Sequence, residues 1–296
     1  MNAIIAFVRT IFVSPDEPRL RAGWRLLFHF VLLGLTTAFI GFLIQLFTIF
    51  VGNLSIPALS SLISLIAITL SVLIARRLLD RRSFRSLGLR WDAQALRDLW
   101  VGILIPAILF ALIFATEWAF GWLDFSGPVT MNTNIASQLG IWLLVFLMVG
   151  WYEELLSRGY WLRNLAEGLN LPLAVFISSA VFSLAHLGNP NASIFSVLGI
   201  LAAGYFLAYP VLRTGQLWMA VGLHIGWNIF EGPVFGFPVS GLDTPGLLLH
   251  SATGPEWLTG GPFGPEAGFI LFPALALGAY LINLYTQGRT PLDTSQ

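Results

Sequence analysis

The chain has 296 residues, of which 56% are hydrophobic and only 10% are charged. A soluble globular domain carries about a quarter charged residues, so this composition excludes an ordinary soluble protein. The formal net charge is zero, which argues against nucleic acid as a partner. The chain has no cysteine, which excludes a disulfide, a thiolate metal ligand and a cysteine nucleophile.

Apolar segments long enough to cross a bilayer core, about 20 residues, recur along the whole chain. They predict an all-α fold: a polytopic transmembrane bundle of about eight membrane-spanning helices, forming one integral membrane domain over residues 23–288. Residues 1–22 are expected to form a cytoplasmic or interfacial segment with a short amphipathic helix over 1–13, and residues 289–296 a cytoplasmic tail. The spans are expected at 26–51, 59–75, 99–120, 139–161, 174–187, 194–212, 217–235 and 267–285.

Arginine supplies all fifteen basic residues, and its placement predicts how the chain crosses the membrane. Outside the predicted spans, arginines lie before the first, between the second and third, and after the fourth, sixth and eighth. The connections 52–58, 121–138, 188–193 and 236–266 contain none. Because basic residues concentrate on the cytoplasmic side, both termini are expected in the cytoplasm of a protein integral to the cell or inner membrane. The glycine- and proline-rich stretch 236–266 is then an irregular outer loop that could cap the bundle.

A cluster of ionisable residues lies near the end of the fourth predicted span, where such groups are rare and usually functional. Glu154 and Arg158 are four residues apart and therefore share a helix face within ion-pairing distance. Glu153 points about 100° away from Glu154, so one carboxylate can be neutralised while the other stays free. A solvated helix end with a surface salt bridge is the alternative interpretation.

Two further clusters lie in the fifth and seventh predicted spans. Phe182 and His186 are four residues apart on one face, although a lone histidine in an apolar helix is more often a hydrogen-bonded packing residue than a catalyst. His224 and Asn228 also share a face, and Gly226 between them would let a neighbouring helix approach closely. Aligned polar groups in an apolar helix need partners within the bundle, which a functional site or a structural interhelical hydrogen bond would supply.

Two other acidic residues lie near the outer ends of predicted spans. Glu231, three residues beyond Asn228, could extend the face of His224 or take a capping or loop role. Glu117, near the end of the third span, has no evident partner and is expected at the membrane interface.

Glutamate and histidine side chains in this combination suggest two chemistries. Glu153 and His186 could act as general bases that activate a water for attack on a peptide carbonyl, while His224 and Asn228 donate hydrogen bonds to the tetrahedral oxyanion. Alternatively, Glu153, His186 and His224 could hold a zinc ion with an open fourth position. The H-E-x-x-H pair of the common zinc peptidases is absent, and the residues alone leave both chemistries open.

The three clusters together resemble the CAAX protease and bacteriocin-processing family, which includes the type II CAAX prenyl endopeptidases and many bacterial self-immunity proteins. The family motifs E-E-x-x-x-R, F-x-x-x-H and H-x-x-x-N/D match Glu153-Glu154 with Arg158, then Phe182 with His186, and His224 with Asn228. Their order, spacing and membrane setting all agree. The motif-bearing core covers about residues 139–230. The resemblance implies a helical membrane bundle whose site is buried in the bilayer and opens toward the cytoplasm.

The resemblance also implies a function, that of an intramembrane endopeptidase acting on a membrane-associated, prenylated or bacteriocin-like peptide. Glu153 and His186 would then activate the water, His224 and Asn228 would steady the oxyanion, and Glu154 with Arg158 would form a supporting pair. A divalent metal such as zinc, held by Glu153, His186 and His224, and a metal-free mechanism both stay open. The alternatives are a non-enzymatic immunity or scaffold protein in the same fold and a proton-coupled transporter, which the absence of an internal repeat disfavours.

One prediction from the sequence conflicts with this arrangement. His186 lies about fifteen residues, or about 22 Å, into a fifth span that starts near Leu171. It would therefore approach the outer leaflet, whereas Glu153 and His224 are expected nearer the cytoplasm. For the motifs to meet, the fifth helix must begin outside the bilayer, tilt, or break near Pro172.

Overall fold

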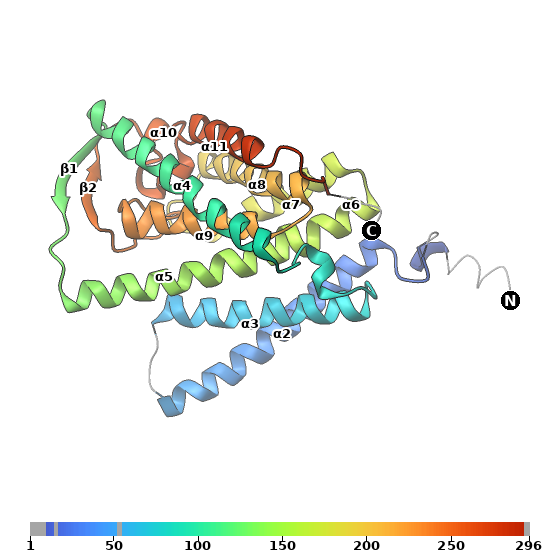
Figure 1. The fold of residues 1–296 in the computed structure, drawn as a ribbon. Helices are drawn as coiled ribbons and strands as arrows, with labels where there is room; N and C mark the ends of the chain where they lie inside the picture. Colours follow the sequence, from blue (N-terminus) through green and yellow to red (C-terminus); the bar gives the residue numbers. More distant parts are fainter. Residues whose placement is uncertain (1–9, 15–16, 52–54, 293–296) are drawn as a thin grey trace, which may run out of the picture.

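The computed structural model describes residues 10–14, 17–51 and 55–292 and shows a bundle of helices (Figure 1). The predicted helical membrane bundle is thereby confirmed. Residues 1–9 of the predicted interfacial helix and residues 293–296 of the predicted tail lie outside the described residues. The helices are α2 (Ala22–Val51), α3 (Ile56–Leu78), α4 (Ala93–Ala119), α5 (Thr133–Glu154), α6 (Leu162–Gly168), α7 (Leu171–Ala185), α8 (Ile194–Thr214), α9 (Trp218–Ile229), α10 (Glu256–Thr259) and α11 (Leu271–Tyr285).

Within the described residues, six helices are long and apolar enough to cross a membrane: α2, α3, α4, the continuous helix of α5 and α6, α7 with its following turn, and α8. The predicted number of eight is therefore not confirmed, because α9 and α11 are shorter. Helix α9 continues through a π-helical segment, Phe230–Val234. All its residues from Met219 to Asn228 are buried, so it lies inside the bundle, surrounded by protein.

The outer helix α2 differs from α9 in its exposure. It presents apolar side chains outward, among them Phe30, Leu35 and Phe42, and each is more than half exposed. A contiguous apolar surface of this kind on a soluble monomer would cause association, whereas lipid solvates it. Helix α2 packs on α3, and α3 packs on α5. The bundle interior is thus built by α4, α8 and α9, with α2 at its edge (Figure 1).

The stretch 236–266, expected to be irregular, contains the strand β2 (Leu248–Ala252). It pairs antiparallel with β1 (Leu123–Pro128), and an irregularity interrupts the register between Phe125 and Gly127. The remainder holds α10 and two 3₁₀ turns, Gly261–Phe263 and Pro265–Ala267. The all-α prediction missed this ribbon because both strands lie in connections between helices, where periodicity gives little signal.

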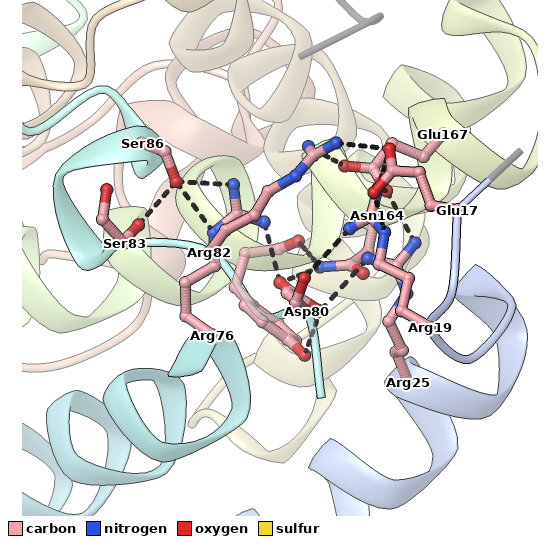
Figure 2. A network of polar contacts seen from close by, with 11 residues as sticks. Glu17, Arg19, Arg25, Arg76, Asp80, Arg82, Ser83, Ser86, Asn164 and Glu167 are labelled. Atoms are coloured by element: carbon pink, nitrogen blue, oxygen red, sulfur yellow. Dashed lines mark hydrogen bonds and ion pairs between the residues drawn. The ribbon is translucent and has the colours of Figure 1, made fainter. Parts of the chain in front are cut away.

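The opposite end of the bundle from this ribbon is held by ion pairs around Asp80, which follows α3 (Figure 2). Asp80 is almost fully buried and lies 3.1 Å from Nη1 of Arg25 and 2.7 Å from Nη1 of Arg76. Tyr160 and Asn164 donate further hydrogen bonds to its carboxylate. These contacts join the start of α2, the end of α3 and the helix of α6. We call the group of Glu17, Arg19, Arg25, Arg76, Asp80, Arg82 and Glu167 the Asp80 network.

Replacing Asp80 by asparagine is expected to lower the free energy of unfolding by about 3 kcal/mol, because breaking a buried ion pair leaves charge uncompensated. The expected loss is at the lower end of the usual range for a buried ion pair, because Arg25 would keep its ion pair with Glu167 and Arg76 its hydrogen bond to Ser86. Detergent-based unfolding of the purified protein measures the change. Asp92→Asn is the matched control, because an asparagine caps the start of α4 as well as the aspartate does. Equal stability of the two variants would contradict the prediction.

Candidate active site

The three motifs line one cavity of about 520 Å³. Helices α3, α5, α7, α8 and α9 and the outer stretch 236–266 form its walls. Most of the lining is apolar, including Trp142, Phe146 and Val149 on successive turns of α5. The polar lining residues that could carry chemistry are Glu153, His186, His224, Asn228, Ser240 and Glu266.

The first motif lies where α5 passes into a π-helical segment, Leu155–Trp161, a feature frequent at functional sites. Glu154 and Arg158 form the predicted ion pair, with 2.8 Å between Oε1 and Nη1, and both side chains are 0% exposed. Arg158 also donates from Nη2 to the carbonyl of Gly204 at 3.0 Å. The pair is therefore buried inside the bundle, and the alternative of a solvated surface salt bridge is wrong. Glu153 instead lines the cavity with a side chain that is 25% exposed.

The third motif is joined to the first by a hydrogen bond that the sequence did not indicate. Oε1 of Glu154 lies 2.9 Å from Nδ1 of His224, so this carboxylate bridges Arg158 and His224. The other imidazole nitrogen, Nε2, lies 3.8 Å from Oε2 of Glu153. His224 is thus held between the two adjacent glutamates. Asn228 follows one turn later on α9 and lines the same cavity.

The second motif packs against both of the others. The ring of Phe182 lies 4.2 Å from the guanidinium carbon of Arg158, 4.8 Å from the His186 ring and 6.0 Å from the His224 ring, measured between centroids. Nδ1 of His186 lies 2.8 Å from the backbone oxygen of Phe182. A carbonyl can only accept, so Nδ1 carries a hydrogen, and in the neutral ring Nε2 then keeps its lone pair.

The length of the α5–α6 helix explains how Glu153 and His186 reach the same depth in the bundle, which the predicted spans did not allow. This helix runs on to Gly168, beyond the predicted end at residue 161. Glu153 therefore lies fifteen residues before the turn into α7 (168 − 153), and His186 lies fifteen residues after it (186 − 171). At 1.5 Å per residue both are about 22 Å from that turn. Pro172 occupies the first turn of an unbroken α7, where proline is well tolerated.

Glycines set the close approach of the motif helices. A Cβ on Gly150 of α5 would lie 2.9 Å from the backbone nitrogen of Ile225 on α9, so a larger residue would push the two helices apart. The predicted role of Gly226 is also confirmed, since its Cα faces the backbone of Ile103 on α4. The contact of α5 with α9 is what brings Glu154 within hydrogen-bonding distance of His224.

Gly150→Val is expected to separate α5 from α9, lower the free energy of unfolding by about 1–3 kcal/mol and reduce activity by about 100-fold, since a displacement of about 1 Å has that effect. Gly140→Val is the control on the same helix, because nothing lies within 4 Å of its Cβ position. Thermal unfolding and hydrolysis rates of both variants provide the measurement. A Gly150→Val protein as active as Gly140→Val would show that this approach is unimportant.

The residues suggested as metal ligands do not form a coordination set in this arrangement. Among the described residues, no three histidine, aspartate or glutamate side chains are grouped closely enough to hold an ion. Nδ1 of His224 contacts Glu154 and Nδ1 of His186 contacts a backbone carbonyl. Contacts of this kind also support histidines that bind zinc through Nε2, so they fit either chemistry, and only the spacing of Glu153, His186 and His224 departs from a shared zinc site.

The cavity contains a carboxylate that sequence reasoning missed. Glu266, in the outer stretch, is buried, and its oxygens accept hydrogen bonds from Trp227 of α9 at 3.0 Å and from Ser240. It lines the cavity together with both motif histidines. An isolated acidic residue in a glycine- and proline-rich connection carries no pattern that marks it as part of a site.

The structure corrects the expectations for two other glutamates. Glu117 was expected at the interface, but it is buried and lines a second cavity, of about 490 Å³, beside β2. Glu231 is fully buried and takes no exposed capping role. Within the described part of the chain, neither carboxylate has a hydrogen-bond partner. Hydropathy placed both residues correctly near helix ends but could not show that the ribbon and the outer stretch cover them.

The comparison with known families agrees with this geometry. The model of the family described as type II CAAX prenyl endopeptidase Rce1-like matches residues 135–230, a segment that contains all three motifs. No curated protein matches the chain. The resemblance predicted from the motifs is confirmed: residues 135–230 are similar to the Rce1-like type II CAAX prenyl endopeptidases.

Proposed function

We propose that this protein is an intramembrane endopeptidase that hydrolyses a peptide bond of a membrane-associated substrate with a water activated by Glu153 and His186. The observation that carries the proposal is the meeting of three motifs from α5, α7 and α9 around one cavity that is mostly apolar. The family match supports the same class of reaction.

Glu153 and His186 are suited to act as bases because each keeps an unused acceptor. Oε2 of Glu153 is buried without a hydrogen-bond partner in the described residues, and Nε2 of His186 keeps its lone pair as argued above. A water between them could give up a proton as its oxygen attacks the substrate carbonyl. General-base catalysis of this kind contributes about 100- to 10,000-fold to the rate.

His224 and Asn228 are suited to stabilise the oxyanion that the attack creates. Glu154 fixes the His224 ring through Nδ1 and leaves Nε2 to donate toward the substrate oxygen. Nε2 can donate at the same time as Nδ1 only from the imidazolium, whose charge Glu153 and Glu154 would balance. Asn228 would supply the second donor from its amide. Preorganised donors of this kind act strongly where water is excluded.

The placement of the two glutamates favours an enzyme over a non-enzymatic immunity or scaffold protein. Glu154 and Arg158 pair with each other and are both 0% exposed, as a supporting pair requires. Glu153 instead lines the cavity with a side chain that is 25% exposed, so it is the carboxylate that a water and a substrate can reach.

The test compares cleaved peptides in membranes that contain either the unmodified protein or the Glu153→Gln variant. New amino termini are labelled and identified by mass spectrometry after incubation. We expect a set of cleavages in membrane-associated sequences that the variant lacks. If the two samples give the same termini while the protein binds a partner equally well in both forms, the scaffold interpretation replaces the peptidase.

A further inference from the structure

The cavity that the motifs line contains a carboxylate that the proposed mechanism does not use. Glu266 lines this cavity together with His186 and His224. Its oxygens accept hydrogen bonds from the indole nitrogen of Trp227 at 3.0 Å and from the hydroxyl of Ser240. Both donors are neutral groups, so they fix the carboxylate at the cavity wall without neutralising its charge.

The backbone around Glu266 and Ser240 holds the two side chains in place. The carbonyl of Glu266 lies against Gly199 of α8, so close that a Cβ at this position would overlap it. Ser240 has a φ of 47°, a conformation that is uncommon for a residue with a side chain and that is often found at functional sites. Its carbonyl accepts a hydrogen bond from Nδ2 of Asn189 at 2.9 Å. Because Asn189 follows His186 by three residues, these contacts join the outer stretch to the end of the second motif.

The charges of the site leave Glu266 without a counter-ion. In the proposed mechanism, Glu153 and Glu154 balance Arg158 and the imidazolium of His224. Among the described residues, each ion pair of an arginine involves a carboxylate other than Glu266, and the chain contains no lysine. An ionised carboxylate in an apolar cavity is costly unless a cation lies against it. A cationic group that enters the cavity would therefore bind most favourably beside Glu266.

The position of Glu266 on α9 places such a cation close to the reacting atoms. Trp227, which donates to Glu266, follows His224 by three residues, so the two side chains share a helix face and are about 4.5 Å apart along the axis. An extended peptide advances about 3.3 Å per residue. A cation bound at Glu266 therefore belongs to a residue near the bond that is cleaved.

We infer that Glu266 and Ser240 form a subsite for an ammonium or guanidinium group of the substrate, so that cleavage takes place within about three positions of a lysine or arginine. The inference rests on the proposed function for the reaction, and on the hydrogen bonds and charges above for the subsite. The apolar wall of the cavity, with Trp142, Phe146 and Val149, would contact apolar side chains of the same peptide. Basic residues commonly flank the apolar segments of membrane peptides, so the subsite fits the end of such a segment.

The first measurement does not depend on activity. The purified full-length protein is heated with hexylamine, which carries an ammonium group on a short alkyl chain, or with hexanol, which lacks the charge. A compound that binds the folded protein raises its Tm, so we expect hexylamine to raise the Tm more than hexanol does. Glu266→Gln is expected to abolish this difference. Glu256→Gln is the matched control, because it removes the same charge from an exposed side chain of the same outer stretch, outside the cavity.

The second measurement identifies the residues beside the cleaved bond. Among the new amino termini that depend on Glu153, we expect a lysine or arginine within about three positions of that bond. Two synthetic peptides based on one such site are then compared, identical except that methionine replaces the basic residue in one of them. The unmodified protein and Glu256→Gln are expected to hydrolyse the basic peptide with a kcat/KM about 10- to 100-fold higher, the range for a hydrogen bond to a charged group. Glu266→Gln is expected to hydrolyse both peptides similarly.

Equal effects of hexylamine and hexanol on the unmodified protein would overturn the inference, as would internal sites without a basic residue or a Glu266→Gln protein that still prefers the basic peptide. Sites confined to the first few residues of substrates would assign the cation to a free amino terminus. If no cleavage depends on Glu153 while Glu266→Gln still abolishes the effect of the amine, the proposed function fails and the cationic subsite remains. The site sequences and the peptide pair use the unmodified protein, so they decide the matter even if Glu266→Gln does not fold.

Discussion

Replacing Glu153 by glutamine is expected to lower kcat/KM by about 100- to 10,000-fold, the usual contribution of a general base. Glutamine keeps the shape of the side chain but cannot take a proton from water. The free energy of unfolding is expected to fall by less than about 1 kcal/mol, because the Oε2 atom has no hydrogen-bond partner within the described residues and its contact with Nε2 of His224 is long, at 3.8 Å. Hydrolysis of a peptide identified from the membrane digests, together with thermal unfolding, measures both quantities.

Glu117→Gln is the matched control for this substitution. It makes the same change at a buried carboxylate without a hydrogen-bond partner in the described residues, away from the cavity that the motifs line. We expect this variant to hydrolyse the peptide at the rate of the unmodified protein. A Glu153→Gln protein that retains activity similar to that of Glu117→Gln would remove Glu153 from the mechanism.

Replacing Glu154 by leucine is expected to lower the free energy of unfolding by about 3–5 kcal/mol, since it leaves a buried arginine uncompensated. Arg158 is 0% exposed and would keep only the Gly204 carbonyl and the face of Phe182. The same change removes the partner of His224, so activity falls together with stability. Unfolding of the purified protein by titration with a denaturing detergent gives the first quantity, and peptide hydrolysis gives the second.

The double variant Glu154→Leu with Arg158→Met separates these two effects. Removing both charges at once often restores stability because apolar side chains replace a desolvated ion pair. We therefore expect the double variant to unfold near the unmodified protein while remaining inactive, because His224 still lacks its carboxylate. If Glu154→Leu alone unfolds like the unmodified protein, the pair does not hold the site together.

The helical fold and the motif residues were predictable because each depends on short-range sequence properties. Hydropathy over about 20 residues identifies a helix that lipid can solvate, as with α2, α3 and α4. Glu154 and Arg158 are four residues apart and are therefore neighbours on the surface of any helix that contains them, independently of the tertiary structure. The sequence therefore predicted the pair, and the structure added only that it is buried.

The contacts between helices were not predictable in the same way. The bond from Glu154 to His224 joins residues seventy positions apart, and Glu266 reaches the site from a connection with no regular period. The ends of helices were also misjudged, since a hydropathy window stops at Trp161 whereas the α5–α6 helix continues to Gly168. That error alone produced the apparent difference in depth between Glu153 and His186.

The π-helical segment Leu155–Trp161 separates two parts of one helix that must face different partners. Upstream, Glu153 and Glu154 face the cavity and His224; downstream, Asn164 and Glu167 face the Asp80 network. A π-helical turn holds one residue more than an α-helical turn, which amounts to about 100° of rotation. An uninterrupted α-helix with the same upstream contacts would turn Asn164 and Glu167 away from Asp80 and Arg25. The segment thus sets the rotational phase between the candidate site and the Asp80 network. An α-helix shorter by one residue would keep both sets of contacts, whereas an α-helix of the same length could keep only one of them.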